Sequence, residues 1–295
     1  MPEQHPLAAL LTRADALLAR VEALLPAPPP RADLDAAVAF RWLRHNGRGA
    51  LQAVTRPHQI RLSDLQGIDE QKARIEQNTR QFIAGRSANN VLLTGARGTG
   101  KSSLVKAMLN RYAAKGMRLI EVDKSDLVDL AQIVELIADR RERYVIFCDD
   151  LSFEAHEPGY KALKSVLDGS VAGMPENLLL YATSNRRHLM PEYMAENLEA
   201  QHVGEEIHPG EGVEEKISLS ERFGLWLSFY PFNQDHYLAI CAHWLAQYGL
   251  DPAAIESARC EALQWALARS SRSGRSAWQF ARDFAGRTPR RRKPR

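Results

Sequence analysis

The feature that most constrains this chain is a glycine-rich loop that joins a short apolar run to a helix-forming segment. The apolar run covers residues 90–94 and predicts a buried strand, and residues 102–115 predict a helix. The loop consists of Gly95, Ala96, Arg97, Gly98, Thr99, Gly100, Lys101 and Ser102. It matches the pattern G-x-x-x-x-G-K-[ST] in the strand–loop–helix context that the pattern requires. Successive N–H groups of such a loop point at a phosphate and the helix N-terminus adds positive charge, so the sequence predicts a nucleotide-binding unit.

Two side chains at the end of this loop have separate expected roles. Lys101 is expected to bridge the β- and γ-phosphates of the nucleotide, and the Ser102 hydroxyl is expected to ligate Mg²⁺. Ser103 follows directly and completes the expected nucleotide-binding set, to which all eight loop residues belong. The alternative is a glycine-rich turn that ends in Lys-Ser by chance, and it would require both flanks to match by coincidence.

A pair of carboxylates follows another apolar run. Residues 144–148 predict a strand that ends at Asp149 and Asp150, and Asp149 comes 48 residues after Lys101. Mg²⁺ is a hard ion held by oxygen, so we expect Asp149 to reach the metal through water and Asp150 to activate the attacking water. Asp150 is one methylene shorter than the glutamate common at such a position, which predicts slow hydrolysis or a contribution from Glu154. The alternative is an acidic turn without a catalytic role.

Five short apolar runs are spaced along the middle of the chain, and helical-looking segments separate most of them. The runs cover residues 90–94, 118–122, 144–148, 178–182 and 225–229. Strands that are apolar throughout indicate a parallel sheet covered on both faces. After Pro231, helices are expected at 234–248, 252–269 and 275–285. We therefore predict an α/β fold, a five-stranded parallel P-loop sheet followed by an all-helical C-terminal unit.

The N-terminal part of the sequence predicts a helical accessory region. Residues 7–25 have a helix-forming composition that stops at the proline-rich stretch 26–30, which we interpret as a stiff spacer. Residues 33–44 predict a second, short helix with Asp33 as its N-cap. The predicted units are residues 1–61 (accessory region), 62–232 (nucleotide-binding core), 233–286 (C-terminal helices) and 287–295 (basic tail).

Cysteine content and hydropathy restrict the expected location of the protein. The chain has three cysteines, far apart in sequence, so a disulfide framework is not expected. No stretch approaches the ~18 uncharged apolar residues of a membrane span, and the N-terminus lacks the layout of a signal peptide. We expect a cytoplasmic protein without a membrane partner. Core packing is the expected role of Cys148, Trp226, Trp244, Trp265 and Trp278.

Charge is distributed unevenly. The net charge is +3, but residues 287–295 carry six positive charges and no negative one, whereas residues 186–221 carry nine acidic and three basic residues. The tail is expected either to contact DNA or to be solvated. The acidic segment is either a solvated insertion or a docking surface for a basic partner.

From about Leu62 to Phe284 the sequence resembles the AAA+ ATPases, and within them a bacterial family of predicted AAA+ proteins of unassigned function. The resemblance rests on residues 93–103 (LTGARGTGKSS), 148–154 (CDDLSFE) and 220–224 (SERFG). It implies a parallel sheet with a helical lid, ATP and Mg²⁺ at the interface between subunits, and ring-shaped or helical homo-oligomers.

The resemblance also implies roles for three further residues. Asn185, preferred over Ser184, is similar to the polar sensor near the γ-phosphate. Arg222 matches the arginine finger that reaches the neighbouring subunit's nucleotide and stabilises charge in the transition state. Arg275 resembles the second sensor arginine of the lid. As alternatives, Asn185 caps a turn, and the two arginines form surface ion pairs.

The work that ATP would drive stays open at this level. A nucleic-acid-linked ATPase, similar to bacterial initiators and helicase loaders, fits two features of the sequence. One is the pair Asp149 and Asp150 after the apolar run 144–148, and the other is the basic tail. A protein-remodelling ATPase is the second class, but residues 124–129 lack the aromatic residue that threading unfoldases usually carry there. The third is a switch that binds ATP and barely hydrolyses it.

Overall fold

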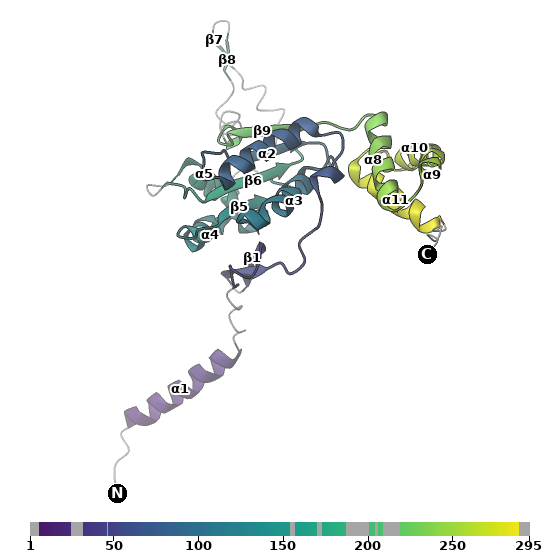
Figure 1. Cartoon of the computed structure of the whole chain (residues 1–295). Coiled ribbons are helices and arrows are strands. Elements are labelled where there is room, and N and C mark those ends of the chain that lie inside the picture. The colour runs from purple at the N-terminus through teal and green to yellow at the C-terminus, as the bar shows by residue number, and fades with distance from the viewer. Residues whose placement is uncertain are drawn as a thin grey trace.

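A seven-stranded sheet forms the centre of the computed structural model, which describes residues 6–24, 32–45, 47–153, 157–169, 173–186, 201–203, 206–208 and 219–288 (Figure 1). The strand order is β2-β1-β4-β5-β6-β3-β9. The strands are β1 Ala39–His45, β2 Arg48–Ala53, β3 Val91–Gly95, β4 Met117–Glu121, β5 Arg143–Cys148, β6 Leu178–Ser184 and β9 Leu225–Phe229. A separate antiparallel pair consists of β7 Gln201–Val203 and β8 Glu206–His208.

The strands β4, β5, β6, β3 and β9 pair in parallel. They coincide with the five apolar runs of the sequence. All seven residues of β6 are buried, as are five of the six in β5, because helices cover both faces of a parallel sheet. The predicted α/β fold with a parallel sheet is confirmed, and the sheet is extended by two further strands at one edge.

The predicted helix over residues 33–44 is wrong, because the second half of this segment is strand β1 and the first half contains no helix. β1 pairs in parallel with β4 and antiparallel with β2. Phe40 and Trp42 are each 1% exposed, whereas Arg41 between them is exposed, a period of two that fits a strand. Asp33 accepts a hydrogen bond from Asp35 N and so caps a turn rather than a helix.

The sequence contains a signal for this hairpin. The register pairs His45 with Arg48, so the two residues Asn46 and Gly47 connect β1 to β2. Asn-Gly is the dipeptide that two-residue hairpin turns favour. The N-terminal region therefore contributes an edge to the sheet and is not helical throughout.

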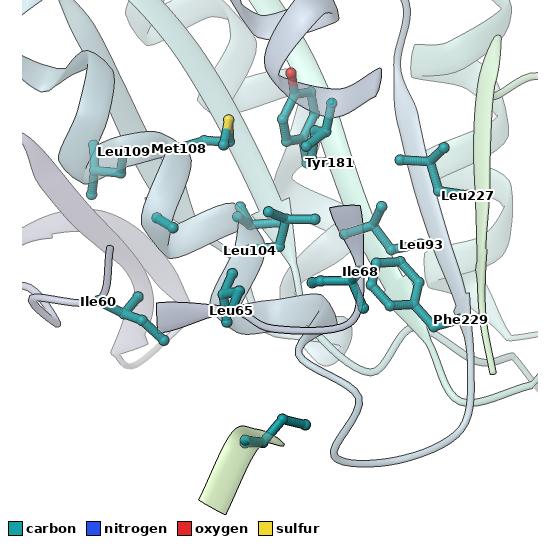
Figure 2. Packing of buried hydrophobic residues seen from close by; sticks show 14 of the residues in the cluster. Ile60, Leu65, Ile68, Leu93, Leu104, Met108, Leu109, Tyr181, Leu227 and Phe229 are labelled. Carbon is teal, nitrogen blue, oxygen red and sulfur yellow. The ribbon is translucent and has the colours of Figure 1, made fainter. Parts of the chain in front are cut away.

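Four α-helices accompany the parallel strands, together with short 3-10 helices. They are α2 Asp69–Ile83, α3 Lys101–Tyr112, α4 Leu130–Ile137 and α5 Pro158–Asp168, with η1 Leu62–Asp64, η2 Ala113–Lys115 and η3 Lys124–Asp129. Side chains alternate along each strand, so Leu93 belongs to one core cluster and Leu92 to the other. Helices α2 and α3 share the cluster of Leu93, in which Leu104 and Tyr181 also lie (Figure 2). Helices α4 and α5 share the cluster of Leu92, so the two pairs cover opposite faces of the sheet.

The C-terminal unit consists of four helices that gather at one side of the sheet (Figure 1). They are α8 Gln234–Gln247, α9 Pro252–Ser257, α10 Arg259–Ala268 and α11 Gly274–Arg287. The side chains of Asn233, Asp251 and Ser273 cap the N-termini of α8, α9 and α11. The expected single helix over 252–269 is interrupted at Ala258, where α9 ends and α10 begins.

The first helix, α1 Pro6–Leu24, agrees with the helix expected over residues 7–25. Leu10, Leu11, Leu17 and Leu18 of this helix are exposed. Among the described residues, none of the helices combines the length and the apolar character needed to cross a bilayer.

Candidate functional site

The glycine-rich loop has a backbone that only glycine adopts without strain. Gly95 has φ +123°, and a Cβ there would lie 2.0 Å from the carbonyl oxygen of Phe229 on the adjacent strand β9. Gly98 has φ +73°, and a Cβ there would lie 2.7 Å from Cβ of Ser273, the residue that caps α11. The Gly98 carbonyl also accepts a hydrogen bond from Gly274 N at 2.8 Å. The loop is therefore fitted between the last strand of the sheet and the first turn of a C-terminal helix.

A cavity of about 670 Å³ lies beside this loop. The loops that follow β3, β5 and β6 all contribute to it, because the carboxyl ends of parallel strands lie at one edge of the sheet. Eleven of the predicted site residues line it: Arg97, Gly98, Thr99, Gly100, Lys101, Ser102, Ser103, Asp149, Asp150, Asn185 and Arg275. The structure thus brings together residues that are up to 178 positions apart in sequence, since 275 − 97 = 178.

Lys101 lies folded over the loop, and its side chain is almost fully buried. Its ammonium donates to the carbonyl oxygens of Gly95 at 2.7 Å and Ala96 at 2.8 Å, and to Asn185 Oδ1 at 3.1 Å. Burial lowers the pKa of Lys101 below its usual 10.5, and the nearby carboxylates of Asp149 and Asp150 oppose that shift. Gly95 and Ala96 therefore hold the lysine rather than line the cavity.

The residues expected to bind Mg²⁺ are in direct contact. Ser102, in the first turn of α3, donates its hydroxyl proton to Asp149 Oδ1 at 2.6 Å. The same oxygen accepts a hydrogen bond from Thr183 Oγ1 of β6 at 2.5 Å. A hydroxyl and a carboxylate beside a phosphate-binding loop are hard oxygen donors, so this set fits Mg²⁺.

Asn185 connects the lysine to the second carboxylate. Its amide nitrogen donates to Asp150 Oδ1, while its Oδ1 accepts from Lys101. Ser184, by contrast, is fully buried and accepts from Arg186 N, so Asn185 is the one of the pair that lines the cavity. Asp150 has φ +54°, a left-handed backbone that is uncommon outside glycine.

The two predicted arginines occupy different places. Arg275 lies at the start of α11 and lines the cavity opposite the loop. Arg222 is not among the lining residues; it comes just before β9 and forms an ion pair with Asp168 at the end of α5. This ion pair matches the alternative given for Arg222, a surface ion pair. The role of Arg222 as an arginine finger stays a prediction. Glu154 lies outside the described residues.

The assignment to core packing is incomplete for Trp244, which packs against a core cluster and also lines the cavity, and wrong for Trp278, which lines the cavity without joining either core cluster. Trp244 of α8 and Trp278 of α11 line the cavity, together with Phe232 and Ile68. One available signal was the spacing of Trp278, three residues after Arg275, which places both side chains on one face of a helix. Cys148 is buried in the core as expected. The cavity therefore combines its carboxylates with an apolar and aromatic lining.

Comparisons with known proteins agree with this arrangement. Residues 35–288 match a protein family described as "Protein of unknown function (DUF815)". No curated protein matches the chain significantly in sequence. Among solved structures, the FIGL-1 AAA domain in complex with ADP is 18% identical with a TM-score of 0.51, over 77% of this chain and 73% of that chain.

Two further solved structures are similar at lower TM-scores. They are the Orc1 protein of Aeropyrum pernix in complex with DNA (19% identity, 72% of this chain, 58% of that chain, TM-score 0.49) and the HORMA:CdnC:Trip13 complex of E. coli MS115-1 (16%, 75%, 90%, 0.48). At 18% identity, the likeness to the FIGL-1 AAA domain concerns the fold alone.

Proposed function

The chain belongs to the DUF815 family of proteins of unknown function, and we propose that it is an ATPase. It would bind ATP with Mg²⁺ at subunit interfaces and use hydrolysis to remodel a macromolecular partner. One observation carries the proposal: the phosphate-loop lysine and serine, both carboxylates and the sensor asparagine lie beside a cavity in one hydrogen-bond network, which Thr183 connects. A structural turn would not need this combination of groups.

Nucleotide binding would use the glycine-rich loop and the aromatic residues that line the cavity. The N–H groups of the loop residues 97–102, which line the cavity, and the N-terminus of α3 would attract the phosphates. Lys101, now satisfied by two carbonyl oxygens, would exchange them for phosphate oxygens. Trp244 and Trp278 would lie against the base, and Arg275 would face the phosphates from the lid. Mg²⁺, held by Ser102 and through water by Asp149, would neutralise charge on the β- and γ-phosphates.

Hydrolysis would depend on Asp150 and Asn185. Asp150 is the only carboxylate besides Asp149 that the described part of the parallel strand ends places beside Lys101, so it is the proposed base for the attacking water. Asn185 holds one of its oxygens and would report loss of the γ-phosphate through Lys101. The short aspartate side chain, already engaged by Asn185, supports slow turnover and favours an ATP-dependent switch as the second candidate function.

Oligomerisation would complete the site. Arg222 lies outside its own subunit's cavity, as a residue that acts on a neighbouring subunit must. We propose that Arg222 leaves Asp168 and reaches the neighbour's γ-phosphate in a homo-oligomer.

The basic residues 289–295 and most of the acidic segment lie outside the described residues. We propose DNA as the partner of the tail; a protein partner at the acidic segment remains the alternative. ATP turnover with and without single-stranded DNA, in parallel with a variant truncated after residue 286, separates the two. Stimulation that depends on the tail and weakens with salt supports DNA.

A mixing experiment tests hydrolysis between subunits. Arg222→Ala retains its own cavity, and Asp150→Asn retains the finger, so neither variant alone should hydrolyse ATP. Mixed oligomers should recover measurable turnover, because a complete site forms between two different subunits. If the mixture stays as inactive as the separate variants while both bind ATP and assemble, catalysis between subunits is wrong.

A further inference from the structure

A threonine outside the expected motif residues lies between the two carboxylates. Thr183 is 2% exposed, and its Oγ1 donates to Asp149 Oδ1 at 2.5 Å. The same oxygen accepts a hydrogen bond from Asp150 N at 2.9 Å. A hydroxyl has one proton to donate and can accept in return, so this single group is engaged with both acidic residues at once.

The position of Thr183 follows from the sheet. The parallel ladder between β5 and β6 ends at the pair Cys148 and Ala182. Beyond this pair, the Thr183 side chain still binds the segment after β5 by accepting a hydrogen bond from Asp150 N. The Thr183 carbonyl oxygen accepts another from Leu151 N at 2.6 Å. The turn that carries both carboxylates is therefore attached to β6 through one residue.

The backbone of this turn needs such support. Asp150 has φ +54°, in the left-handed region that is unfavourable for a residue with a Cβ. Strained conformations of this kind persist when the surrounding structure holds them. The bond from Asp150 N to Thr183 holds the residue directly.

We propose that Thr183 is a positioning residue for Mg²⁺ binding, an inference that rests on the proposed function. Thr183 and Ser102 donate to the same oxygen of Asp149, from β6 and from α3 respectively. Two donors from different elements fix the rotation of the carboxylate, which would then meet the water on the metal in one orientation. Hydrogen-bond partners of metal-binding groups commonly contribute on the order of 10- to 100-fold to metal affinity.

The test measures Mn²⁺ binding, a paramagnetic substitute for Mg²⁺, to the protein–ADP complex by electron paramagnetic resonance. Thr183→Val keeps the side-chain shape and removes the hydroxyl. We expect Mn²⁺ affinity to fall roughly 10-fold. ADP affinity without metal should change less than about twofold, because the loop and Lys101 are untouched. Thr183→Ser, which keeps the hydroxyl, should restore Mn²⁺ affinity.

Thr79→Val is the matched control. Thr79 is a fully buried threonine of α2 with two hydrogen-bond partners, Ile75 O and Tyr181 OH, and it is not among the residues that line the cavity. Its loss should lower the melting temperature without changing Mn²⁺ affinity. Thr183→Ala provides a second removal of the hydroxyl if the valine variant does not fold.

The outcomes are distinguishable. Unchanged Mn²⁺ affinity in Thr183→Val overturns the inference and leaves the proposed function intact, as does an equal loss of Mn²⁺ affinity in Thr79→Val. A wild-type protein that binds no ADP overturns the proposed function and this inference together.

Discussion

At the scale of single residues, Lys101 determines how the site responds to phosphate. In the structure its ammonium is buried against two carbonyl oxygens and the amide of Asn185, an arrangement that lowers its pKa through desolvation. Burial destabilises the charged ammonium, and the negative charge of a bound phosphate would stabilise it. Lys101 is therefore prepared for an anion rather than engaged in a structural ion pair.

This gives a prediction for pH. Phosphate stabilises charged Lys101, so the pKa of Lys101 is higher in the complex than in the free protein, where it is already below 10.5. By linkage, ADP affinity is full below the lowered pKa and falls as pH rises toward the pKa of the complex. Calorimetry without metal should show weakening that begins at a lower pH than the titration of an ordinary lysine would produce.

Lys101→Arg is the control, because arginine stays protonated throughout this range. Its ADP affinity should be nearly independent of pH, whatever its absolute value. Wild-type affinity that stays flat as pH rises to the usual pKa of lysine, about 10.4, would show that Lys101 does not contact the nucleotide in its charged form.

At the scale of elements, the contact between the phosphate loop and helix α11 is the most informative. Gly98 meets Ser273, and Gly274 donates to the Gly98 carbonyl, so the loop and the C-terminal helices are directly joined. A movement of the loop would therefore displace α11, as is required of a lid that responds to nucleotide.

Gly98→Ala tests this contact. A Cβ would lie 2.7 Å from Ser273 Cβ, so the loop and α11 must separate. Gly116→Ala is the matched control, since Gly116 has φ +93° and no atom within 4 Å of the added Cβ. Both variants should lose about 1–2 kcal/mol of stability from backbone strain. Only Gly98→Ala should also weaken ADP binding; equal affinities in the two variants would contradict a role for the contact.

The β1–β2 hairpin is the second element with a measurable consequence. Trp42 is 1% exposed in the core and donates to Asp129 Oδ2 at 3.0 Å. Trp42→Ala should cost about 3–5 kcal/mol in urea unfolding, as a truncation in a core does. Leu10→Ala on the exposed face of α1 should change stability by less than about 0.5 kcal/mol. Similar small losses for both would mean that the hairpin is an appendage.

The elements that the sequence predicted are those whose signal is local. Continuous apolar runs gave the five parallel strands, and the loop pattern gave Lys101 and Ser102, because one strand–loop–helix unit contains the whole motif. The hairpin was missed because Leu34, Val38 and Trp42 also fit a helical spacing, and only packing against β4 decides between the two periods. Thr183 was missed because its role depends on the end of a ladder between strands, which no local pattern records.

At the scale of the whole molecule, the site depends on three separate parts. The sheet edge supplies the carboxylates, the loop and α3 supply the phosphate site, and the C-terminal helices supply Arg275 and the two tryptophans. The proposed arginine finger would act on a neighbouring copy. In the proposed mechanism, binding would therefore need one chain, whereas hydrolysis would need at least two.

The most direct test of the account is calorimetric titration of a non-hydrolysable ATP analogue with Mg²⁺ into wild-type protein, Lys101→Ala and Lys161→Ala. Lys161, exposed on α5, is the matched lysine control. We expect the wild type to bind one nucleotide per chain. Lys101→Ala should bind at least about tenfold more weakly, a loss of about 1.4 kcal/mol, and Lys161→Ala should bind as the wild type does. Absence of binding to the wild type, or equal affinity in all three proteins, would contradict it.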